Sequence, residues 1–428
     1  MSSVKPNHIL GMNARTQEYT GLNSREAKRF GFSKLRAKNF LKKHGIQVPE
    51  LYASISSREE LRSFDWQSIN GSFAIKPANG SAGKGIIVIQ KFKRREQVWV
   101  DVEGNEYSEQ DLDLHVGDIL DGRYTTWGTR HSAIIEERIL IHPDLEPHVE
   151  MGTPDVRIIL FHKIPVMAMA RLPTEESDGR ANLDQGAIAC GIDLGTGKTT
   201  FAVSGKKKII KEIPKSGVVS NEIQIPYWKQ ALKTAVRVAN ATGYVYMGVD
   251  IFLDPEKGPV IAEVNGFPGL SIQLANRAGL RRRLERVEGI TARNVNHAVK
   301  IAQSLFAESF PAADTDLVII EPREEVVVYG DDKKSETVRT QINTGRFRSA
   351  ISLEIAQKLG LVDDDDLLWR QNVEEEGKVP VVEVRFKLKD RVITTTMTVS
   401  KRLKSKSYEV EIGRKDLSGF LIASEERS

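Results

Sequence analysis

The chain has 428 residues, too many for one compact core at the usual domain size of roughly 100 to 200 residues, so two or three domains are expected. Its 62 Lys and Arg residues against 58 Asp and Glu residues leave a formal net charge of +4, which is close to neutral over this length and argues against a nucleic-acid-binding protein. The single cysteine excludes an intrachain disulfide, and the chain has neither a signal peptide nor a run of about 18 apolar residues, so we expect a cytoplasmic protein without a transmembrane segment.

The first part of the chain alternates helical and extended patterns. Residues 24–43 are rich in helix formers, begin with a serine cap and stop at Gly45, which predicts one or two helices. Short runs of apolar, β-branched residues at 73–77 and 85–90 predict a hairpin with a glycine-rich tip. The same composition predicts further strands at 132–140, 155–163 and 164–172.

The pattern changes near residue 311. Before it, the spacing of apolar residues predicts a helix at 227–242, strands at 244–253 and 259–265, and two closing helices at 270–287 and 292–310. Proline and acidic residues at 311–316 then predict a domain boundary. Residues 317–428 alternate apolar and polar side chains, which predicts a small antiparallel β domain. The predicted organisation is therefore an α+β domain at 1–310 and an all-β domain at 317–428.

Glu263 and Asn265 stand two residues apart in a predicted strand, so their side chains should point to the same side. Asp250, in the preceding predicted strand, would add a third oxygen ligand. Oxygen ligands of this kind suit Mg²⁺, which completes its shell with water and substrate phosphates, so a nucleotide is implied. The alternative is that these side chains face solvent at a strand end.

Lys76 precedes a loop with Gly80, Gly83 and Lys84, where glycines allow close approach to phosphate and lysines supply charge. Because two predicted strands flank it, this loop suits a flap over a nucleotide better than a P-loop, although a hairpin without ligand is an equal alternative. The stretch at 191–200 nearly spells a Walker A motif, but Ile192 stands where the first glycine is required, so we interpret it as a hairpin.

Several arginines lie between the flap and the acidic residues: Arg157, close to Asp155, then Arg171, and Arg180 with Asn182. Guanidinium groups bind carboxylates and phosphates by paired hydrogen bonds and stabilise a phosphoryl group in transfer. A single arginine is more often a surface residue. Because these arginines lie in the sequence between the predicted flap and the acidic pair, together they favour an active site.

These motifs follow one another in a definite order: a lysine before a glycine-rich hairpin, an acidic hinge, a set of arginines, and then Asp and Glu-x-Asn followed by Pro-Gly. In this order the chain resembles the ATP-grasp superfamily over roughly residues 5–308. The resemblance is to α-L-glutamate ligase-like proteins, related to ribosomal-protein glutamate ligases and sugar-transfer-associated ATP-grasp proteins. It implies two α+β subdomains that clasp ATP. It also implies nucleotide binding by Lys76, Gly80, Ser81, Ala82, Gly83, Lys84, Glu136, Glu137 and Ile139; acyl-phosphate and phosphate binding by Arg157, Arg171, Arg180 and Asn182; and Mg²⁺ or Mn²⁺ binding by Asp250, Glu263 and Asn265. Residues 13–15 and Lys34 also resemble family features.

Residues 342–354 and 408–422 resemble a second family, the retropepsin-like proteins described as ATP-dependent zinc proteases. That family has Asp-Thr-Gly where this chain has Asn343, and an amide cannot act as a general base at neutral pH. Residues 317–428 also lack His and Cys, so a zinc site has no support. The resemblance implies a small β-barrel, and Asn343 argues against proteolysis by it. Such a barrel would bind a peptide or a partner, or form a homodimer. A purely structural role is the alternative.

The resemblance implies an ATP-dependent ligase that joins a carboxylate to an amine through an acyl phosphate, with small molecules or peptides as substrates. It suggests glutamate as the group added and a peptide or an amino sugar as acceptor, while the residues themselves identify neither. The alternative is a regulator or scaffold that binds nucleotide without catalysis, since Asn343 shows that catalytic residues have been lost in this chain. A peptidase is the least favoured function.

Overall fold

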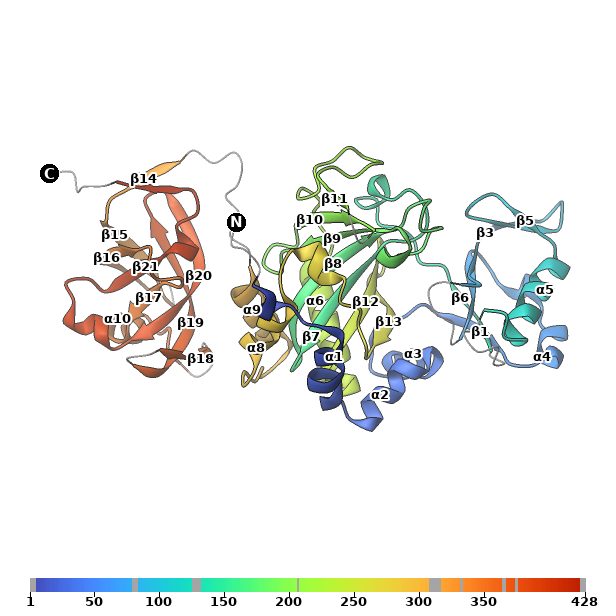
Figure 1. Cartoon of the computed structure of the whole chain (residues 1–428), viewed down its shortest axis with the longest axis horizontal. Coiled ribbons are helices and arrows are strands. Elements are labelled where there is room, and N and C mark those ends of the chain that lie inside the picture. The colour runs from blue at the N-terminus through green and yellow to red at the C-terminus, as the bar shows by residue number, and fades with distance from the viewer. Residues whose placement is uncertain are drawn as a thin grey trace. The chain divides into compact units, whose positions relative to one another are not determined.

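The computed structural model describes residues 5–78, 84–124, 132–205, 208–307, 317–331, 334–363, 367–373 and 376–423. Two compact units are present, Met1–Glu288 and Gly289–Ser428 (Figure 1). The predicted domain boundary at 311–316 and the glycine-rich loop at 79–83 lie outside the described residues. Within the described parts of the chain, no helix combines the length and the apolar composition needed to cross a membrane.

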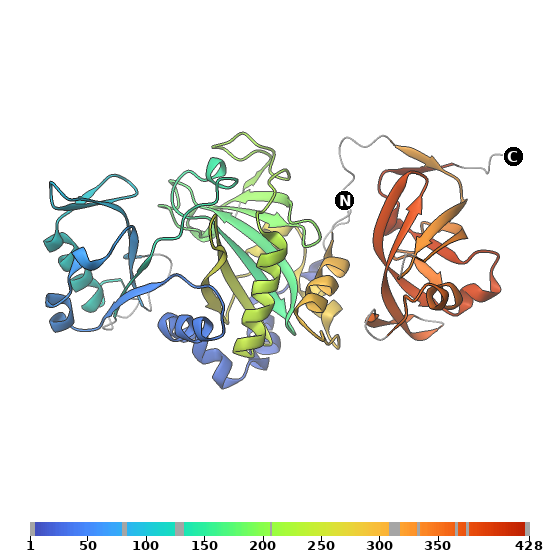
Figure 2. The same ribbon diagram turned by 180° about the vertical axis from the view of Figure 1, so that it is seen from behind.

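A seven-stranded sheet with strand order β11-β10-β9-β8-β7-β12-β13 forms the centre of the first unit (Figure 1). Its strands are β7 (Asp155–Phe161), β8 (Ile164–Leu172), β9 (Ile188–Ile192), β10 (Thr199–Ser204), β11 (Lys208–Ile210), β12 (Tyr246–Asp254) and β13 (Gly258–Asn265). Every residue of β7 and β8 is buried, because both faces of the sheet are covered. Helix α6 (Trp228–Thr242) lies along one face (Figure 2), and α7 (Ile272–Asn276) and α8 (Leu280–Val287) lie on the other.

Two predictions for this sheet have clear outcomes. The stretch at 191–200 is a hairpin, as predicted: β9 and β10 pair antiparallel, and the Asp193 carboxylate accepts the backbone N–H groups of Gly195 and Thr196 in the turn. The single helix predicted at 270–287 is wrong, since α7 and α8 are separate. Arg277 breaks it by adopting a left-handed φ of 45°, which no proline signals in the sequence.

A six-stranded sheet with order β1-β6-β2-β3-β4-β5 forms the other part of this unit. Its strands are β1 (Leu51–Ile55), β2 (Phe73–Pro77), β3 (Ile87–Lys93), β4 (Val98–Asp101), β5 (Glu106–Tyr107) and β6 (Ala133–Glu137). Helices α4 (Arg58–Arg62) and α5 (Glu109–Leu120) pack on it around a core that includes Trp66, Phe73 and Trp99. The antiparallel pairing of β2 with β3 confirms the predicted hairpin.

The N-terminal segment is helical. It comprises α1 (Met12–Ala14), a π-helical turn (Arg15–Tyr19), α2 (Arg25–Phe32) and α3 (Lys34–Lys43). The hydroxyl of Ser24 accepts the N–H of Ala27 at 3.1 Å and so caps α2 as predicted, while Ser33 starts a second helix in the same way. The prediction of one or two helices is therefore confirmed as two, and Gly45 follows with the left-handed φ that suits a helix end.

The second unit is a closed β-barrel with helix α9 (Val295–Phe306) packed on it. Its strands are β15 (Arg323–Tyr329), β16 (Ser335–Asn343), β17 (Ala350–Ser352), β18 (Leu367–Val373), β19 (Gly377–Leu388), β20 (Arg391–Ser400) and β21 (Val410–Gly413), with α10 (Leu353–Lys358) after β17 and a separate pair β14 (Val318–Ile320) and β22 (Phe420–Ile422). Pairing of β15 with β19 closes six strands around a core that includes Val328, Phe386 and Met397.

The predicted β domain is confirmed, but its purely antiparallel character is wrong. β16 pairs parallel with β21, and β17 pairs parallel with β20. Alternating apolar and polar residues identify strands facing a core, yet they carry no information about the direction of strands that are distant in sequence.

Candidate active site

A buried ionic cluster lies on one face of the seven-stranded sheet. Asp250 on β12 is paired in register with Arg157 on β7 and with Glu263 on β13, so the three side chains share this face. The guanidinium of Arg157 grips Asp250 with both ends, at 2.7 Å from Nε to Oδ1 and 2.6 Å from Nη2 to Oδ2. This fixes the position of Arg157.

Arg171 extends the cluster to a second carboxylate. It donates Nη2 to Asp250 Oδ2 at 2.7 Å and Nε to Asp155 Oδ1 at 2.6 Å, and its Nη2 also bonds Asp155 Oδ2. Two arginines therefore balance two aspartates in a dry environment. Although burial opposes the charge of Asp250, both arginines hold its pKa well below the usual range, whereas burial and the neighbouring Asp250 charge raise the pKa of Asp155 to about 6 despite Arg171.

A second buried cluster joins helix α3 to the six-stranded sheet. Glu136 on β6 accepts Lys76 from β2 on one carboxylate oxygen and Lys38 from α3 on the other. Burial opposes the charge of Glu136, but the two ammonium groups lower its pKa. Burial and then the adjacent Lys76 lower the pKa of Lys38 to about 7, because one carboxylate cannot compensate fully for two cations.

Lys38 was missed in the analysis of the sequence, although a signal is present there. Lys34 and Lys38 are four residues apart in a helix, which places both on one face. Lys34 is half-buried, and burial lowers its pKa while the negative charges of Glu263, Glu136 and Asp250 oppose the change. Lys34 is thus within electrostatic reach of both clusters.

The two clusters interact with each other electrostatically. Burial would lower the pKa of Lys76, but the charge of Glu136, its hydrogen bonds and the charge of Glu263 raise it. Lys34 of α3 and Lys76 of β2 therefore lie within electrostatic reach of Glu263 on β13, and Lys34 also of Asp250 on β12. Lys76, predicted for the flap, and Glu263, predicted as a metal ligand, thus interact electrostatically, while their binding of a nucleotide and a metal stays a prediction.

The predicted metal ligands differ in what surrounds them. Both oxygens of Asp250 already accept guanidinium hydrogen bonds, and the Asn265 side-chain oxygen accepts the backbone N–H of Phe267 at 2.8 Å. Glu263 is half-buried, and in the described part of the chain no hydrogen bond or ion pair engages its carboxylate. Glu263 is therefore the predicted ligand with an unengaged carboxylate, while Asp250 anchors the arginines and Asn265 holds the turn at Phe267. Metal binding by the three stays a prediction.

The other predicted residues lie in varied surroundings. Gly80, Ser81, Ala82 and Gly83 fall outside the described residues, and Lys84 is exposed. Glu137 pairs with Lys257 and accepts the N–H of Glu50 at 3.2 Å, and Ile139 is buried. Arg180 pairs with Asp178 at 2.8 Å, and Asn182 caps the short 3-10 helix Leu183–Gln185, so the contacts described for these two residues are local and do not link them to Asp250.

Arg15 reaches the same face from the N-terminal segment. Its Nη1 donates to the carbonyl oxygen of Pro268 at 3.2 Å, in the turn that follows Asn265. Among the described residues it makes no ion pair, and its buried Nε has no acceptor; the hydroxyl of Tyr246, on the same sheet face, is also buried without a partner. A half-buried cation without a counter-charge beside the acidic strands is suited to an anionic ligand.

In the second unit, both the oxygen and the nitrogen of the Asn343 side-chain amide form hydrogen bonds. Its oxygen accepts the N–H groups of Gly345 and Arg346 at 3.1 and 3.2 Å, and its nitrogen donates to Glu411 at 3.2 Å. An aspartate could not donate to Glu411, so this network needs the amide. No group of three His, Cys, Asp or Glu side chains positioned for a metal occurs among the residues with described placement.

Comparison with known proteins gives a consistent picture for the first unit. A family model described as sugar-transfer associated ATP-grasp matches residues 14–289. The α-aminoadipate–LysW ligase LysX of Sulfurisphaera tokodaii is 24% identical over 237 residues, which cover 55% of this chain and 59% of the relative, so the chain spans less than two thirds of the relative's length.

Solved structures of low sequence identity are also similar. D-alanine–D-alanine ligase from Bacillus anthracis, complexed with ATP, is 13% identical with a TM-score of 0.35, covering 66% of this chain and 68% of that chain. The VanG D-Ala:D-Ser ligase from Enterococcus faecalis is 16% identical with a TM-score of 0.36, covering 66% and 71%.

Proposed function

Because the chain belongs to the sugar-transfer associated ATP-grasp family, we propose that it is an ATP-dependent ligase that joins a carboxylate to an amine. The observation that carries the proposal is the electrostatic interaction of Lys34 and Lys76 with Glu263, beside the Asp250–Arg157 pair. Lys38 joins this group because it shares the Glu136 carboxylate with Lys76. Three lysines at one side provide for a triphosphate, and the arginines of the sheet provide for a phosphoryl group in transfer.

The proposed reaction has two steps. A carboxylate oxygen of the first substrate attacks the γ-phosphorus of ATP, the bond from that phosphorus to the β–γ bridging oxygen breaks, and ADP leaves. The amine of the second substrate then attacks the acyl carbon, inorganic phosphate leaves, and the amine proton passes to solvent or phosphate. No protein nucleophile is needed; Arg157 and Arg171, held rigidly by Asp155 and Asp250, would stabilise the negative charge on the transferring group.

Glu263 and Asn265 are proposed to hold Mg²⁺, with Asp250 as a further oxygen at its edge. The ion would neutralise the charge of the β- and γ-phosphates. Glu136 is proposed to orient Lys76 and Lys38 toward the nucleotide, and Glu137 and Ile139 to border the adenine.

The experiment that tests the function follows ADP release from Mg·ATP with a panel of amino acids, peptides and amino sugars, and repeats it with hydroxylamine as a surrogate amine. A ligase is expected to release ADP only when a carboxylate is present and to form a hydroxamate from the acyl phosphate, and Glu263→Ala should abolish both. Nucleotide binding without carboxylate-dependent ADP release would favour the alternative, a non-catalytic regulator or scaffold.

The substrates are a finer proposal. The curated relative is named as an α-aminoadipate–LysW ligase, which favours an amino acid with two carboxylates as one substrate here, and glutamate is such an amino acid. The unpaired charge of Arg15 supports a carboxylate that does not react but is held beside the turn at Pro268. A peptide or an amino sugar is proposed as the amine acceptor.

Arg15→Met is accordingly expected to raise the KM of the carboxylate substrate by about 10- to 100-fold, as the loss of a charge-assisted hydrogen bond predicts, and to leave the KM for ATP unchanged. Steady-state kinetics at saturating ATP measure the first value, and Arg15→Lys should recover part of it. Arg36→Met is the matched control. Arg15 lies over the ring of Phe267 at 6.0 Å, and Arg36 lies over the ring of Phe30 at 5.9 Å but on the exposed side of α3. An equal effect on the KM for ATP would contradict the proposed subsite.

Because the pKa of Lys38 is lowered, we expect the protein to take up a proton when nucleotide binds. With a pKa of about 7, the lysine is mostly neutral at pH 8, and phosphate charges beside it favour the ammonium form. Binding of a non-hydrolysable ATP analogue at pH 8 should therefore take up as much as about one proton, and almost none at pH 6, where Lys38 is already charged. Calorimetry in buffers of different protonation enthalpy measures this number. Undiminished uptake in Lys38→Met would show that another group is responsible.

A further inference from the structure

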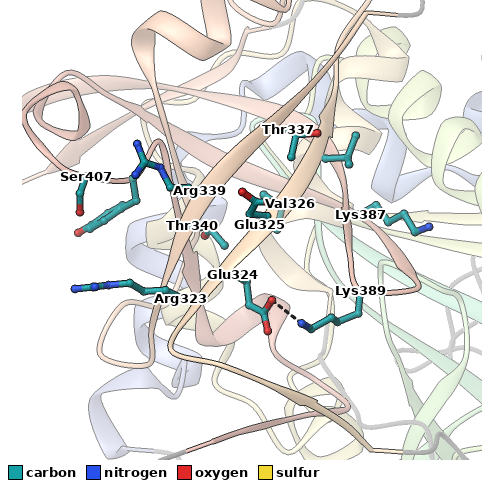
Figure 3. A pocket seen from close by; sticks show the side chains of 12 residues that line it. Arg323, Glu324, Glu325, Val326, Thr337, Arg339, Thr340, Lys387, Lys389 and Ser407 are labelled. Carbon is teal, nitrogen blue, oxygen red and sulfur yellow. Dashed lines mark ion pairs between the residues drawn. The ribbon is translucent and has the colours of Figure 1, made fainter. Parts of the chain in front are cut away.

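The outer wall of the barrel in the second unit carries an open groove of about 760 Å³ (Figure 3). Residues of β15, β16 and the end of β19 line it, together with the segment before β21. The family model ends at residue 289, so this groove belongs to a part of the chain for which the ligase chemistry assigns no role.

Strand alternation explains which side chains line the groove. Val326 and Val328 are buried in the barrel core, so Arg323, Glu325 and Val327 between and beside them point outward. Arg339 stands opposite Glu325 in β16, and Lys387 stands opposite Val327 in β19. Figure 3 shows Arg323 and Arg339 extending to one side, with Ser407 beside Arg339, and Lys387 extending to the other.

The groove has an excess of positive charge. Lys389 pairs with Glu324 at 2.7 Å, which neutralises that carboxylate, and Glu325 is the other acidic side chain of the lining. Against it stand Arg323, Arg339 and Lys387. Within the described residues, neither Arg339 nor Lys387 makes an ion pair, so their charges are available to a partner.

We propose that this groove binds an extended acidic segment of another polypeptide. The backbones of β15 and β16 are paired on both sides, so recognition is by side chains rather than by addition of a strand. Separated cations with Glu325 between them match a segment whose acidic residues alternate with neutral or basic ones. The mixed polar lining and open form also differ from the enclosed apolar pockets that bind small molecules.

A nucleic acid fits the same groove poorly. Its evenly spaced phosphates would meet the Glu325 carboxylate at the centre of the lining. The aromatic side chain of the lining, Tyr408, has Lys406 over its ring at 5.9 Å and donates its hydroxyl to Glu411, so it offers little room for base stacking.

The test uses the full chain and fluorescence anisotropy of three labelled probes: a short peptide that alternates glutamate with serine, its glutamine counterpart, and a single-stranded oligonucleotide. The glutamate peptide is expected to bind, the glutamine peptide to bind at least about tenfold more weakly, and added salt to weaken the first selectively. The double variant Arg339→Glu, Lys387→Glu should weaken the glutamate peptide at least about tenfold.

Lys378→Glu is the matched control. Lys378 is an exposed lysine in β19, the strand of Lys387, but it stands at the opposite end of that strand and does not line the groove. Thermal unfolding verifies that all variants fold. No binding of the glutamate peptide, equal weakening by Lys378→Glu, or groove-dependent binding of the oligonucleotide alone would each overturn the proposal. Sedimentation of the unlabelled chain tests whether a second copy of the chain occupies the groove. If the chain self-associates and the double variant abolishes this association, a second copy is the occupant, and the assignment to another polypeptide is overturned.

Discussion

Replacing Asp250 with asparagine is expected to slow carboxylate-dependent ADP release strongly and to destabilise the first unit. Asparagine keeps the size of the side chain but leaves Arg157 and Arg171 buried with one counter-charge, Asp155, between them. Breaking a buried ion pair in this way costs about 3–5 kcal/mol of unfolding free energy. Arg157 and Arg171 would no longer be held in fixed positions by Asp250. The kcat should therefore fall by about 10²- to 10³-fold, as it does in other enzymes when one preorganised donor is removed.

Urea unfolding and ADP release measure these two effects separately, and Asp254→Asn provides the control. Asp254 lies on the same strand and is equally buried, but it accepts backbone N–H groups from Glu256, Lys257 and Leu140 rather than guanidinium groups. Its substitution should cost stability and leave kcat near the wild-type value. If Asp254→Asn lowered kcat as much as Asp250→Asn, the loss would reflect a general distortion of β12 and not the arginines.

The cluster of Asp250, Arg157 and Arg171 was predictable from the sequence only in part. Glu263 and Asn265 could be assigned to one side of a strand, and Asp250 to its neighbour, from local spacing alone, and the pairing of β12 with β13 confirms both. That Asp250 is saturated by Arg157, 93 residues away in sequence, could not be predicted. It depends on the register between β7 and β12, which is set by packing of the whole sheet.

Lys38 illustrates the same limit for helices. Residues 24–43 could be recognised as helical from composition and caps, and Lys34 and Lys38 could be placed on one face. A basic helix face is ordinarily solvated, and only the docking of α3 against β6 brings Lys38 to Glu136. Strand patterns likewise predicted the β character of the second unit, whereas its parallel pairs and the closure of β15 on β19 arise from contacts between distant segments.

The second large effect is expected from Glu136→Gln. This change leaves the ammonium groups of Lys38 and Lys76 buried beside each other without a carboxylate, and the loss in unfolding free energy should be about 3–5 kcal/mol near pH 6. The deficit should shrink as pH rises. The pKa of Lys38 is about 7 in the wild type and would fall further without Glu136, and Lys76 would lose the carboxylate that raises its pKa. Unfolding of the variant therefore takes up more protons than unfolding of the wild type at alkaline pH, so the stability of the variant rises more steeply with pH.

Adding Lys38→Met to Glu136→Gln identifies the cause. The double variant removes one of the two uncompensated cations and should recover part of the lost stability at pH 6, although it carries one more substitution in the core. In the wild-type background, Lys38→Met leaves the Lys76–Glu136 pair intact and should cost much less than Glu136→Gln. Urea unfolding of the four proteins at pH 6 and pH 9 gives the coupling free energy. A deficit of Glu136→Gln that neither rising pH nor Lys38→Met relieves would mean that Glu136 acts through packing, and that the lysines do not depend on its charge.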